Sequence, residues 1–393
     1  MDTTVGIVGG GPAGLLLARL LRNAGIASVT LESRDRGYVE SRQGAGILEQ
    51  GTVDVLRSAG VGERMDREGM THDGIELRFD RRAHRLDLLA LTGGRSVMVY
   101  PQAEVVKDLI ARQLRQGDPL LFGAEVVAVE GADTDRPVVR FLHEGRERTL
   151  SCDCVVGCDG ADGVTGTAVP ESVRTTYERV HPYSWLGILA EAPPVYDELI
   201  YAHSDRGFAL AGMRSATVSS LCLQVPNGTD PADWPDDRVW DELDARFALD
   251  SDPGWKLRRG PVVAKTVLPL RSSVTEPMRY GRVFLAGDAA HAVSPTGAKG
   301  LDLAASDVIT LARALIHEQN TGSAELLDAY SDTCLRRVWR AEHFSYSMTT
   351  MLHTDPARSA FDTRLQLAQL YRLATSRHAA AELADNYTGL PVG

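Results

Sequence analysis

The sequence feature that most constrains the fold is a glycine-rich turn near the N-terminus, GGGPAG at residues 9–14, which directly follows a short apolar run. It is a G-x-G-x-x-G pattern, in which each glycine has its own physical task. Gly9 permits a tight turn, Gly11 lets the backbone approach a pyrophosphate, and Gly14 allows a helix to pack closely on a strand. A helix that begins here presents free N–H groups and the positive end of its dipole to phosphates. The turn therefore predicts a dinucleotide-binding α/β fold.

The segments on both sides of the turn fit one βαβ unit. The apolar run 5–8 is typical of a buried strand, 15–23 contains good helix formers, and 29–32 is typical of a second strand. Glu32 lies 18 residues after the last glycine of the turn, where an acidic side chain accepts hydrogen bonds from a ribose. This fingerprint alone does not distinguish FAD from NAD.

Composition and charge exclude several classes of protein. The 393 residues are 44% hydrophobic and 24% charged, as in soluble globular chains, and the length suggests two to three domains. A net charge of −11 disfavours nucleic acids and anionic membrane surfaces as partners. No apolar run approaches the roughly 18 to 20 residues that cross a bilayer, and the N-terminus lacks the basic region of a signal peptide. We expect a cytoplasmic protein.

The cysteines indicate neither a disulfide framework nor a metal site. There are five, an odd number for a chain expected in the cytoplasm. Cys152, Cys154 and Cys158 cluster, but their spacing fits no zinc pattern. We interpret them as small buried side chains, and we expect no bound metal.

The pattern of strands and helices divides the chain into a nucleotide-binding domain with an insertion. Residues 1–173 are expected to form its first part, including a small β-sheet at about 125–151. Residues 174–275 are expected to form an antiparallel substrate-binding sheet, and 276–393 complete the first domain and end in helices. Strands are expected near 126–129, 138–142, 149–151, 154–157, 184–189, 207–210, 219–225 and 282–286. Helices are expected near 105–115, 239–247, 304–318, 324–351 and 358–374.

Two further motifs extend the nucleotide fingerprint. Asp159 follows a buried run and precedes Gly160, and Asp288 follows Gly287 at the end of another strand-like run. An aspartate at such a position can hold ribose or ribityl hydroxyls. With the first turn, these motifs resemble the FAD-binding set of flavin-dependent aromatic hydroxylases. Because the chain has one G-x-G-x-x-G, a nicotinamide cofactor would bind transiently on the surface of the FAD domain.

Five segments make the resemblance specific: AGILEQG (45–51), LIYAHSDRGFAL (199–210), RSAT (214–217), PTGAKGLDLAAS (295–306) and NYTGLP (386–391). They resemble the 4-hydroxybenzoate 3-monooxygenase, or para-hydroxybenzoate hydroxylase, family of group A flavoprotein aromatic hydroxylases. The resemblance implies a Rossmann-like FAD-binding domain of that type and a homodimer. It implies FAD, NAD(P)H and O₂ as reactants, and a C4a-hydroperoxyflavin that delivers oxygen to an activated phenol.

The resemblance also implies a proton relay for the phenol. In it, Tyr201 holds the phenolic oxygen, Tyr387 lies behind it, and His72 leads toward solvent. Tyrosine hydroxyls both donate and accept, so such a chain can pass a proton outward. The family places the carbonyl of Pro295 against the substrate hydroxyl.

The loop at 294–300 is expected to lie along the flavin ring, with N–H groups that polarise the flavin N1–C2=O edge. For the nicotinamide nucleotide, the resemblance implies Arg271, and Arg34 and Arg36 are candidates for holding a 2′-phosphate. The FAD contacts implied by resemblance are Arg42, Gln102, Gly297, Lys299, Gly300, Leu301 and Asp302.

The chain departs from the family at the substrate end. Of the serine, arginine and tyrosine that anchor the substrate carboxylate, only Arg214 remains, and Gly212 and Cys222 stand at the other two positions. Both replacements are smaller, so we expect a larger pocket. We therefore expect a ring-substituted substrate such as 3-amino-4-hydroxybenzoate, hydroxylated at C2. The alternatives are ordinary conversion of 4-hydroxybenzoate to protocatechuate, and a flavin-binding reductase or sensor of the same fold.

Further departures lie near the cofactor. Ser220 replaces an arginine that touches the flavin, and Asp302 replaces an asparagine, which adds negative charge near the ring. Gly44, Asp162 and Gly166 replace basic residues of the pyrophosphate and nicotinamide regions. These changes predict a relaxed or switched choice between NADH and NADPH.

Overall fold

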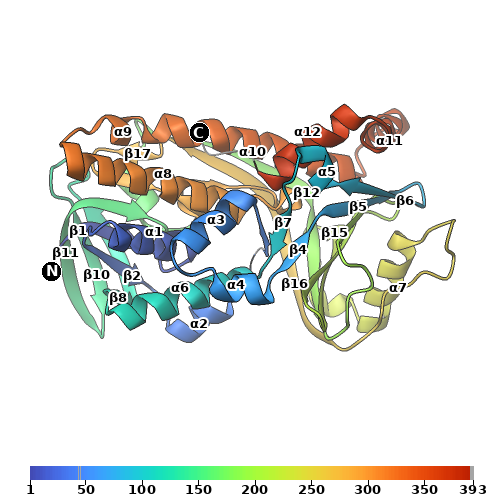
Figure 1. Cartoon of the computed structure of the whole chain (residues 1–393), viewed down its shortest axis with the longest axis horizontal. Coiled ribbons are helices and arrows are strands. Elements are labelled where there is room, and N and C mark those ends of the chain that lie inside the picture. The colour runs from blue at the N-terminus through green and yellow to red at the C-terminus, as the bar shows by residue number, and fades with distance from the viewer. Residues whose placement is uncertain (43, 45, 390–393) are drawn as a thin grey trace.

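The computed structural model describes residues 1–42, 44 and 46–389. Two eight-stranded sheets lie side by side, and long C-terminal helices run across both (Figure 1). The predicted α/β class is confirmed. Residues 45, 390 and 391 of the segments quoted above lie outside the described part of the chain.

The first sheet has the strand order β17-β18-β11-β1-β2-β8, with β10 and β9 extending from β11. Its centre is parallel and buried on both faces, which explains the continuous apolar runs of its strands. The strands predicted at 149–151 and 154–157 are one strand, β11, which belongs to both the main sheet and its small extension. The strands are β1 (Asp2–Val8), β2 (Ser28–Glu32), β8 (Leu120–Phe122), β9 (Ala124–Glu130), β10 (Val138–His143), β11 (Arg146–Gly157), β17 (Arg279–Tyr280) and β18 (Val283–Leu285).

Helices cover one face of this sheet, and β9, β10 and the first part of β11 pack against the other face. Helix α1 begins directly after Gly11 with proline at its first position, where the missing N–H costs nothing, and it packs against α8 and α6. The helices are α1 (Pro12–Asn23), α2 (Arg36–Ser41), α3 (Gln50–Ser58), α4 (Glu63–Glu68), α6 (Gln102–Gln116), α8 (Gly300–Thr321), α9 (Glu325–Asp328) and α10 (Tyr330–Leu352).

The second sheet has the order β19-β16-β12-β15-β14-β13-β5-β6. It is antiparallel except that β13 and β5 pair in parallel. It includes strands from outside residues 174–275, so its topology joins three parts of the chain. Its strands are β5 (Gly74–Phe79), β6 (Arg82–Asp87), β12 (Thr175–Ala190), β13 (Leu199–Ala202), β14 (Ala209–Ser215), β15 (Val218–Pro226), β16 (Val262–Glu276) and β19 (His291–Ala292).

The two faces of the second sheet have different covers. Helix α7 (Asp236–Phe247) packs its apolar side chains on one face. The other face packs against α10, α11 (Ala360–Thr375) and α12 (Arg377–Thr388), whose buried side chains share a core with β5 and β13. A three-stranded sheet of β3 (Ile47–Leu48), β7 (Val97–Val99) and β4 (Met70–His72), with α5 (Leu88–Thr92), lies near the junction.

The C-terminal helices differ from the prediction in two respects. The helix expected at 324–351 is interrupted at Ala329, where α9 ends and α10 begins. Helix α12 was not predicted, although it carries Tyr387. In the described ranges no helix is long and apolar enough to cross a membrane. The same ranges contain no group of side chains suited to a metal ion.

Candidate active site

The glycine-rich turn has the geometry of a phosphate cradle. Gly9 has a φ of +107°, and a Cβ there would lie 2.2 Å from the backbone oxygen of Cys158. A Cβ on Gly14 would lie 2.0 Å from the backbone oxygen of Gly9, so both positions require glycine. A Cβ on Gly11 would meet no described atom within 4 Å, which leaves room beside the N-terminus of α1. The turn fits the pyrophosphate of a dinucleotide.

Glu32 lies beside this cradle at the end of β2. Its Oε2 accepts a hydrogen bond from the Gly10 N–H at 2.6 Å, and its Oε1 accepts one from the Arg34 N–H at 2.7 Å. The carboxylate is therefore held at the edge of the cradle, where a ribose would lie. The Arg34 side chain is exposed, with its guanidinium carbon 5.2 Å from the centre of the Tyr38 ring.

The two Asp-Gly motifs differ in how their carboxylates are used. Asp159 accepts hydrogen bonds from the N–H of Thr165 at 3.0 Å and from its hydroxyl, so it caps the short helix η1 (Thr165–Ala168). Burial raises the pKa of this carboxyl. Asp288 is exposed in η3 (Gly287–Ala289), and Asp307 holds that turn by accepting from the Gly287 N–H at 2.9 Å. Asp288 is thus the more accessible of the two for a ligand hydroxyl.

The loop before α8 packs tightly at one glycine and is open at the other. It forms η4 (Pro295–Gly297), in which Pro295 is half-buried. A Cβ on Gly297 would lie 2.4 Å from the Ser345 hydroxyl of α10, so this glycine allows close packing. A Cβ on Gly300 would meet nothing within 4 Å among the described atoms. The start of α8 is therefore open toward a ligand.

Lys299 connects this loop to a charge group that the sequence analysis missed. Its Nζ is buried and donates to Glu49 Oε1 at 2.6 Å and to the Tyr387 carbonyl at 3.0 Å. Arg337 of α10 donates to Glu49 Oε2 at 2.9 Å. The sequence did offer a signal for Glu49. It directly follows the apolar pair 47–48 in a segment that carries the resemblance, and a carboxylate buried in such a segment requires charged partners.

Asp302 belongs to the same group. Its Oδ1 accepts from the Glu49 N–H at 3.0 Å and from the Thr52 hydroxyl at 2.6 Å. Burial, and then the negative charge of Glu49, raise the pKa of Asp302 to about 7. Leu301 beside it is buried.

Tyr201 and Tyr387 meet as the resemblance implies. Their hydroxyl oxygens lie 2.8 Å apart, and both side chains are buried, one on β13 and the other on α12. Burial raises the pKa of both phenols, so both remain neutral at neutral pH. A neutral pair of hydroxyls can relay a proton by donating and accepting in turn.

His72, which the resemblance places toward solvent in the relay, does not itself reach solvent. The side chain is 1% exposed on β4, which pairs with β7 inside the three-stranded sheet. Neither ring nitrogen has a hydrogen-bond partner among the residues that the structure describes. Burial lowers the pKa of the imidazole, so it remains neutral.

Arg214 has the properties of a carboxylate anchor. It lies on β14, and its Nη2 donates to the Gly44 carbonyl at 2.9 Å. Its Nε is buried and finds no partner in the described ranges. Burial lowers the pKa of the guanidinium, and the half-buried Cys222 opposes that shift.

The room expected at Gly212 is absent. A Cβ there would lie 2.6 Å from Cδ2 of Leu199, so the leucine side chain already fills the space beside the glycine. The prediction of a larger pocket therefore fails at Gly212. At Gly166, where the family carries an arginine, the Arg174 guanidinium donates to the glycine carbonyl at 2.7 Å and supplies a positive charge.

The remaining predicted residues lie at the borders of the site. Arg42, Asp162 and Arg271 are exposed, and Ser220 is half-buried on β15. Gln102 is the first residue of α6, and a Cβ on Gly44 would lie 2.6 Å from its side chain. Arg271 lies on β16, opposite Val180 of β12.

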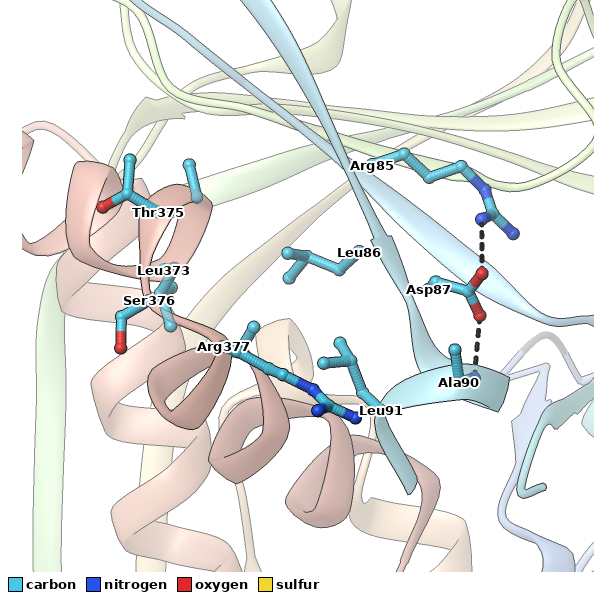
Figure 2. A pocket seen from close by; sticks show the side chains of 11 residues that line it. Arg85, Leu86, Asp87, Ala90, Leu91, Leu373, Thr375, Ser376 and Arg377 are labelled. Carbon is cyan, nitrogen blue, oxygen red and sulfur yellow. Dashed lines mark hydrogen bonds and ion pairs between the residues drawn. The ribbon is translucent and has the colours of Figure 1, made fainter. Parts of the chain in front are cut away.

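A cavity of about 380 Å³ lies elsewhere, between β6 and α5 on one side and α11 and α12 on the other. Figure 2 shows Arg377 extending from the start of α12 toward Leu91, and Arg85 paired with Asp87 at 3.3 Å. None of the predicted site residues lines this cavity.

Comparison with known proteins decides the family. Residues 2–345 match the model of the FAD binding domain family. The p-hydroxybenzoate hydroxylase of Acinetobacter baylyi is 47% identical over 391 residues, which cover 100% of this chain and 96% of that protein. The chain belongs to this family. Its members are FAD-dependent aromatic ring monooxygenases that use NAD(P)H as co-substrate, and membership favours a hydroxylase over a reductase or sensor.

Solved structures agree on the fold. The p-nitrophenol 4-monooxygenase of Pseudomonas putida superposes with a TM-score of 0.81 at 20% identity, covering 99% of both chains. PqsL of Pseudomonas aeruginosa, described as a probable FAD-dependent monooxygenase, gives a TM-score of 0.79 at 20% identity, covering 94% of this chain and 100% of that one. The open positions at Gly11 and Gly300 fit the FAD that this family binds.

Proposed function

We propose that this chain hydroxylates a 4-hydroxybenzoate-type acid that carries a further ring substituent, such as 3-amino-4-hydroxybenzoate. We propose that the new hydroxyl group is added at C2 of the ring. Two features carry the substrate class: a hydrogen-bonded tyrosine pair, and a half-buried arginine whose Nε is buried without a partner in the described ranges. The first group suits a phenol and the second suits a carboxylate.

The register of the sheet sets the length available between these groups. Tyr201 lies opposite Leu210, and Leu210 and Gly212 alternate onto the same face of β14, which has an irregular register with β15 at Arg214. Four residues of strand span about 14 Å. The distance supports a single-ring acid held at both ends.

In this proposal the chain handles the proton and the orientation. The phenol donates to Tyr201, and Tyr201 donates to Tyr387, so that electron density on the ring rises toward that of a phenolate. Arg214 holds the carboxylate, and the Pro295 carbonyl faces the substrate hydroxyl. Bound FAD supplies the redox chemistry, with electrons from NAD(P)H and activation of O₂. His72 is 1% exposed and has no hydrogen-bond partner among the described residues, so no hydrogen bond in that part of the chain links it to the tyrosine pair.

Cys222 supports the ring-substituted substrate. It replaces a tyrosine beside Arg214, which favours extra room at that end, whereas Gly212 gives none because of Leu199. The second candidate is unsubstituted 4-hydroxybenzoate, converted to protocatechuate. Identity of 47% to a p-hydroxybenzoate hydroxylase favours that candidate.

A panel of substituted hydroxybenzoates tests the proposal, with NADH and NADPH oxidation measured alongside product formation. We expect the best coupling, meaning product formed per nicotinamide consumed, with the 3-amino acid, and a C2-hydroxylated product by NMR. Rapid, coupled conversion of 4-hydroxybenzoate to protocatechuate would select the second candidate. The same panel shows whether the chain prefers NADH or NADPH, and single alanine variants of Arg34, Arg36 and Arg271 test whether these side chains give that preference.

We also infer a homodimer. Phe361 and Leu365 on α11 are 71% and 55% exposed, which favours a covered surface in an assembly. Light scattering of the purified protein should give twice the chain mass. A Phe361→Ser variant should shift the mass toward one chain.

A further inference from the structure

One carboxyl oxygen of Asp302 accepts two hydrogen bonds, and the other accepts none from the described residues. Oδ1 accepts from the Glu49 N–H and from the Thr52 hydroxyl, which fixes the carboxyl in one orientation. Oδ2 is buried and has no partner among the residues that the structure describes, and the whole residue is 2% exposed. A buried polar atom in this state requires an explanation, because a buried acceptor without a hydrogen bond is destabilising.

One proton on Asp302 decides the charge of the group around it. Lys299 and Arg337 both bind Glu49, so these three side chains together carry one positive charge. An ionised Asp302 brings the sum to zero, and a protonated Asp302 leaves it at plus one. From the C-terminal side the neutral phenol of Tyr387 faces the group, and Lys299 donates to its carbonyl at 3.0 Å.

The group lies at the start of α8, close to the predicted cofactor position. A Cβ on Gly287 would lie 3.1 Å from Ala304 of α8 and 3.6 Å from Ala13 of α1. The beginnings of both helices therefore converge at the Asp-Gly turn. The inference below rests on the proposed course of the flavin along the loop 294–300.

We propose that Asp302 is a redox-linked proton acceptor, ionised while the bound FAD is oxidised and protonated while it is reduced. Two electrons and one proton, delivered as hydride from NAD(P)H, give FAD one negative charge. Asp302 takes a second proton from solvent on its unused Oδ2, which cancels that charge. Reoxidation of the flavin by O₂ returns the proton.

The pKa of Asp302 and the charge of the reduced flavin both favour proton uptake on reduction. The pKa of Asp302 is raised to about 7 by burial and by Glu49, while Lys299 and the Thr52 hydroxyl oppose the shift. Its proton is therefore available near neutral pH. A negative charge placed nearby raises the pKa of a carboxyl further, so reduction favours uptake.

The test is the pH dependence of the flavin midpoint potential in the holoenzyme without aromatic substrate. We expect the wild type to take up two protons per two electrons over an interval near neutrality, so that its slope there is twice the one-proton slope. Asp302→Asn should show the one-proton slope throughout. Thr52→Val should move the steep interval to higher pH, because the carboxylate loses a hydrogen bond that stabilises it.

An infrared difference spectrum gives a second readout on the wild type. Reduction should produce the carbonyl band of a protonated carboxylic acid, and Asp302→Asn should lack it. Equal slopes in wild type and Asp302→Asn would overturn the proposal. If Asp302→Asn does not bind FAD, two other results decide the question. The proposal is overturned if the wild type shows no carboxylic acid band on reduction, or if the pH interval of steep slope does not move in Thr52→Val. Because no aromatic acid is present, failure of the substrate proposal leaves these results unaffected.

Discussion

The cofactor turn and the tyrosine pair depend on contacts of very different range. The turn is formed by residues 9–14 and the end of one neighbouring strand. A Cβ added at Gly9 or Gly14 would lie only about 2 Å from a backbone oxygen. Tyr201 and Tyr387 are 186 residues apart and meet because α12 docks on the second sheet. A single added methyl group should therefore disrupt the cofactor turn. Removal of a tyrosine hydroxyl should instead leave the structure of the tyrosine pair intact and lower catalytic activity.

The largest effect should come from Gly14→Ala. Its Cβ would lie 2.0 Å from the Gly9 carbonyl, and overpacking of this kind costs about 1–3 kcal/mol or more. We expect loss of bound FAD, seen as loss of the visible flavin absorbance, and a lower unfolding temperature. Gly11→Ala is the matched control, because it should unfold like the wild type while binding FAD more weakly. Equal stability of the two variants would contradict this account of the turn.

Tyr201→Phe should break the second region without unfolding it. Loss of general acid–base assistance lowers kcat about 10²–10⁴-fold, while FAD content and unfolding temperature remain near wild type. Rapid-reaction measurement of the hydroxylation step checks this. Tyr387→Phe should have a similar effect, and the double variant should be little worse than either single one, because the two hydroxyls act as a unit.

Arg214→Lys should show that the other end of the pocket binds rather than reacts. A charge-assisted hydrogen bond contributes about 1.5–3 kcal/mol, so we expect KM for an aromatic acid to rise about 10- to 150-fold with a smaller change in kcat. A phenol that lacks the carboxylate serves as control and should bind both proteins alike. A fall in kcat with unchanged KM would assign Arg214 to the chemical step instead.

The smallest effect should be a contrast in pH dependence between two buried histidines. His353, near the second sheet, accepts from Trp185 at 2.6 Å, and burial lowers its pKa to about 3. As the pH falls, the imidazole of His353 becomes protonated in the unfolded chain before it does so in the folded one. The contribution of neutral His353 to folding stability is therefore complete above pH 6.5 and falls below it, by at most about 1.4 kcal/mol per pH unit.

His291, which lies on β19 and bonds to Asp307 of α8, has the opposite sign. Burial lowers its pKa, but Asp307, 2.6 Å away, outweighs this and raises it, so its stabilisation is present below pH 6.5 and lost as the pH rises through the folded value. Urea unfolding at two pH values should show less acid sensitivity in His353→Gln and less alkaline sensitivity in His291→Gln. Identical pH profiles in both variants would contradict these assignments.

Much of the candidate site was predictable wherever a residue's role depends on its immediate neighbours. Gly9 and Gly14 follow from a turn that leaves no room for a side chain. Arg214 and the tyrosines were predicted by resemblance. Glu49 and Arg337 were not, because the ion group that they form with Lys299 joins residues from before α3, the α8 loop and α10, and local sequence does not show which distant charges meet.

The sequence by itself determined the dinucleotide turn, the βαβ unit that carries it and the family, because these depend on local sterics and on recognisable segments. The tertiary structure alone decided that His72 is buried, that Leu199 fills the space beside Gly212, and that Asp302 is left with an unused oxygen. Each of these depends on packing between segments far apart in the chain. Such packing sets burial, and burial sets the charge that a side chain can hold.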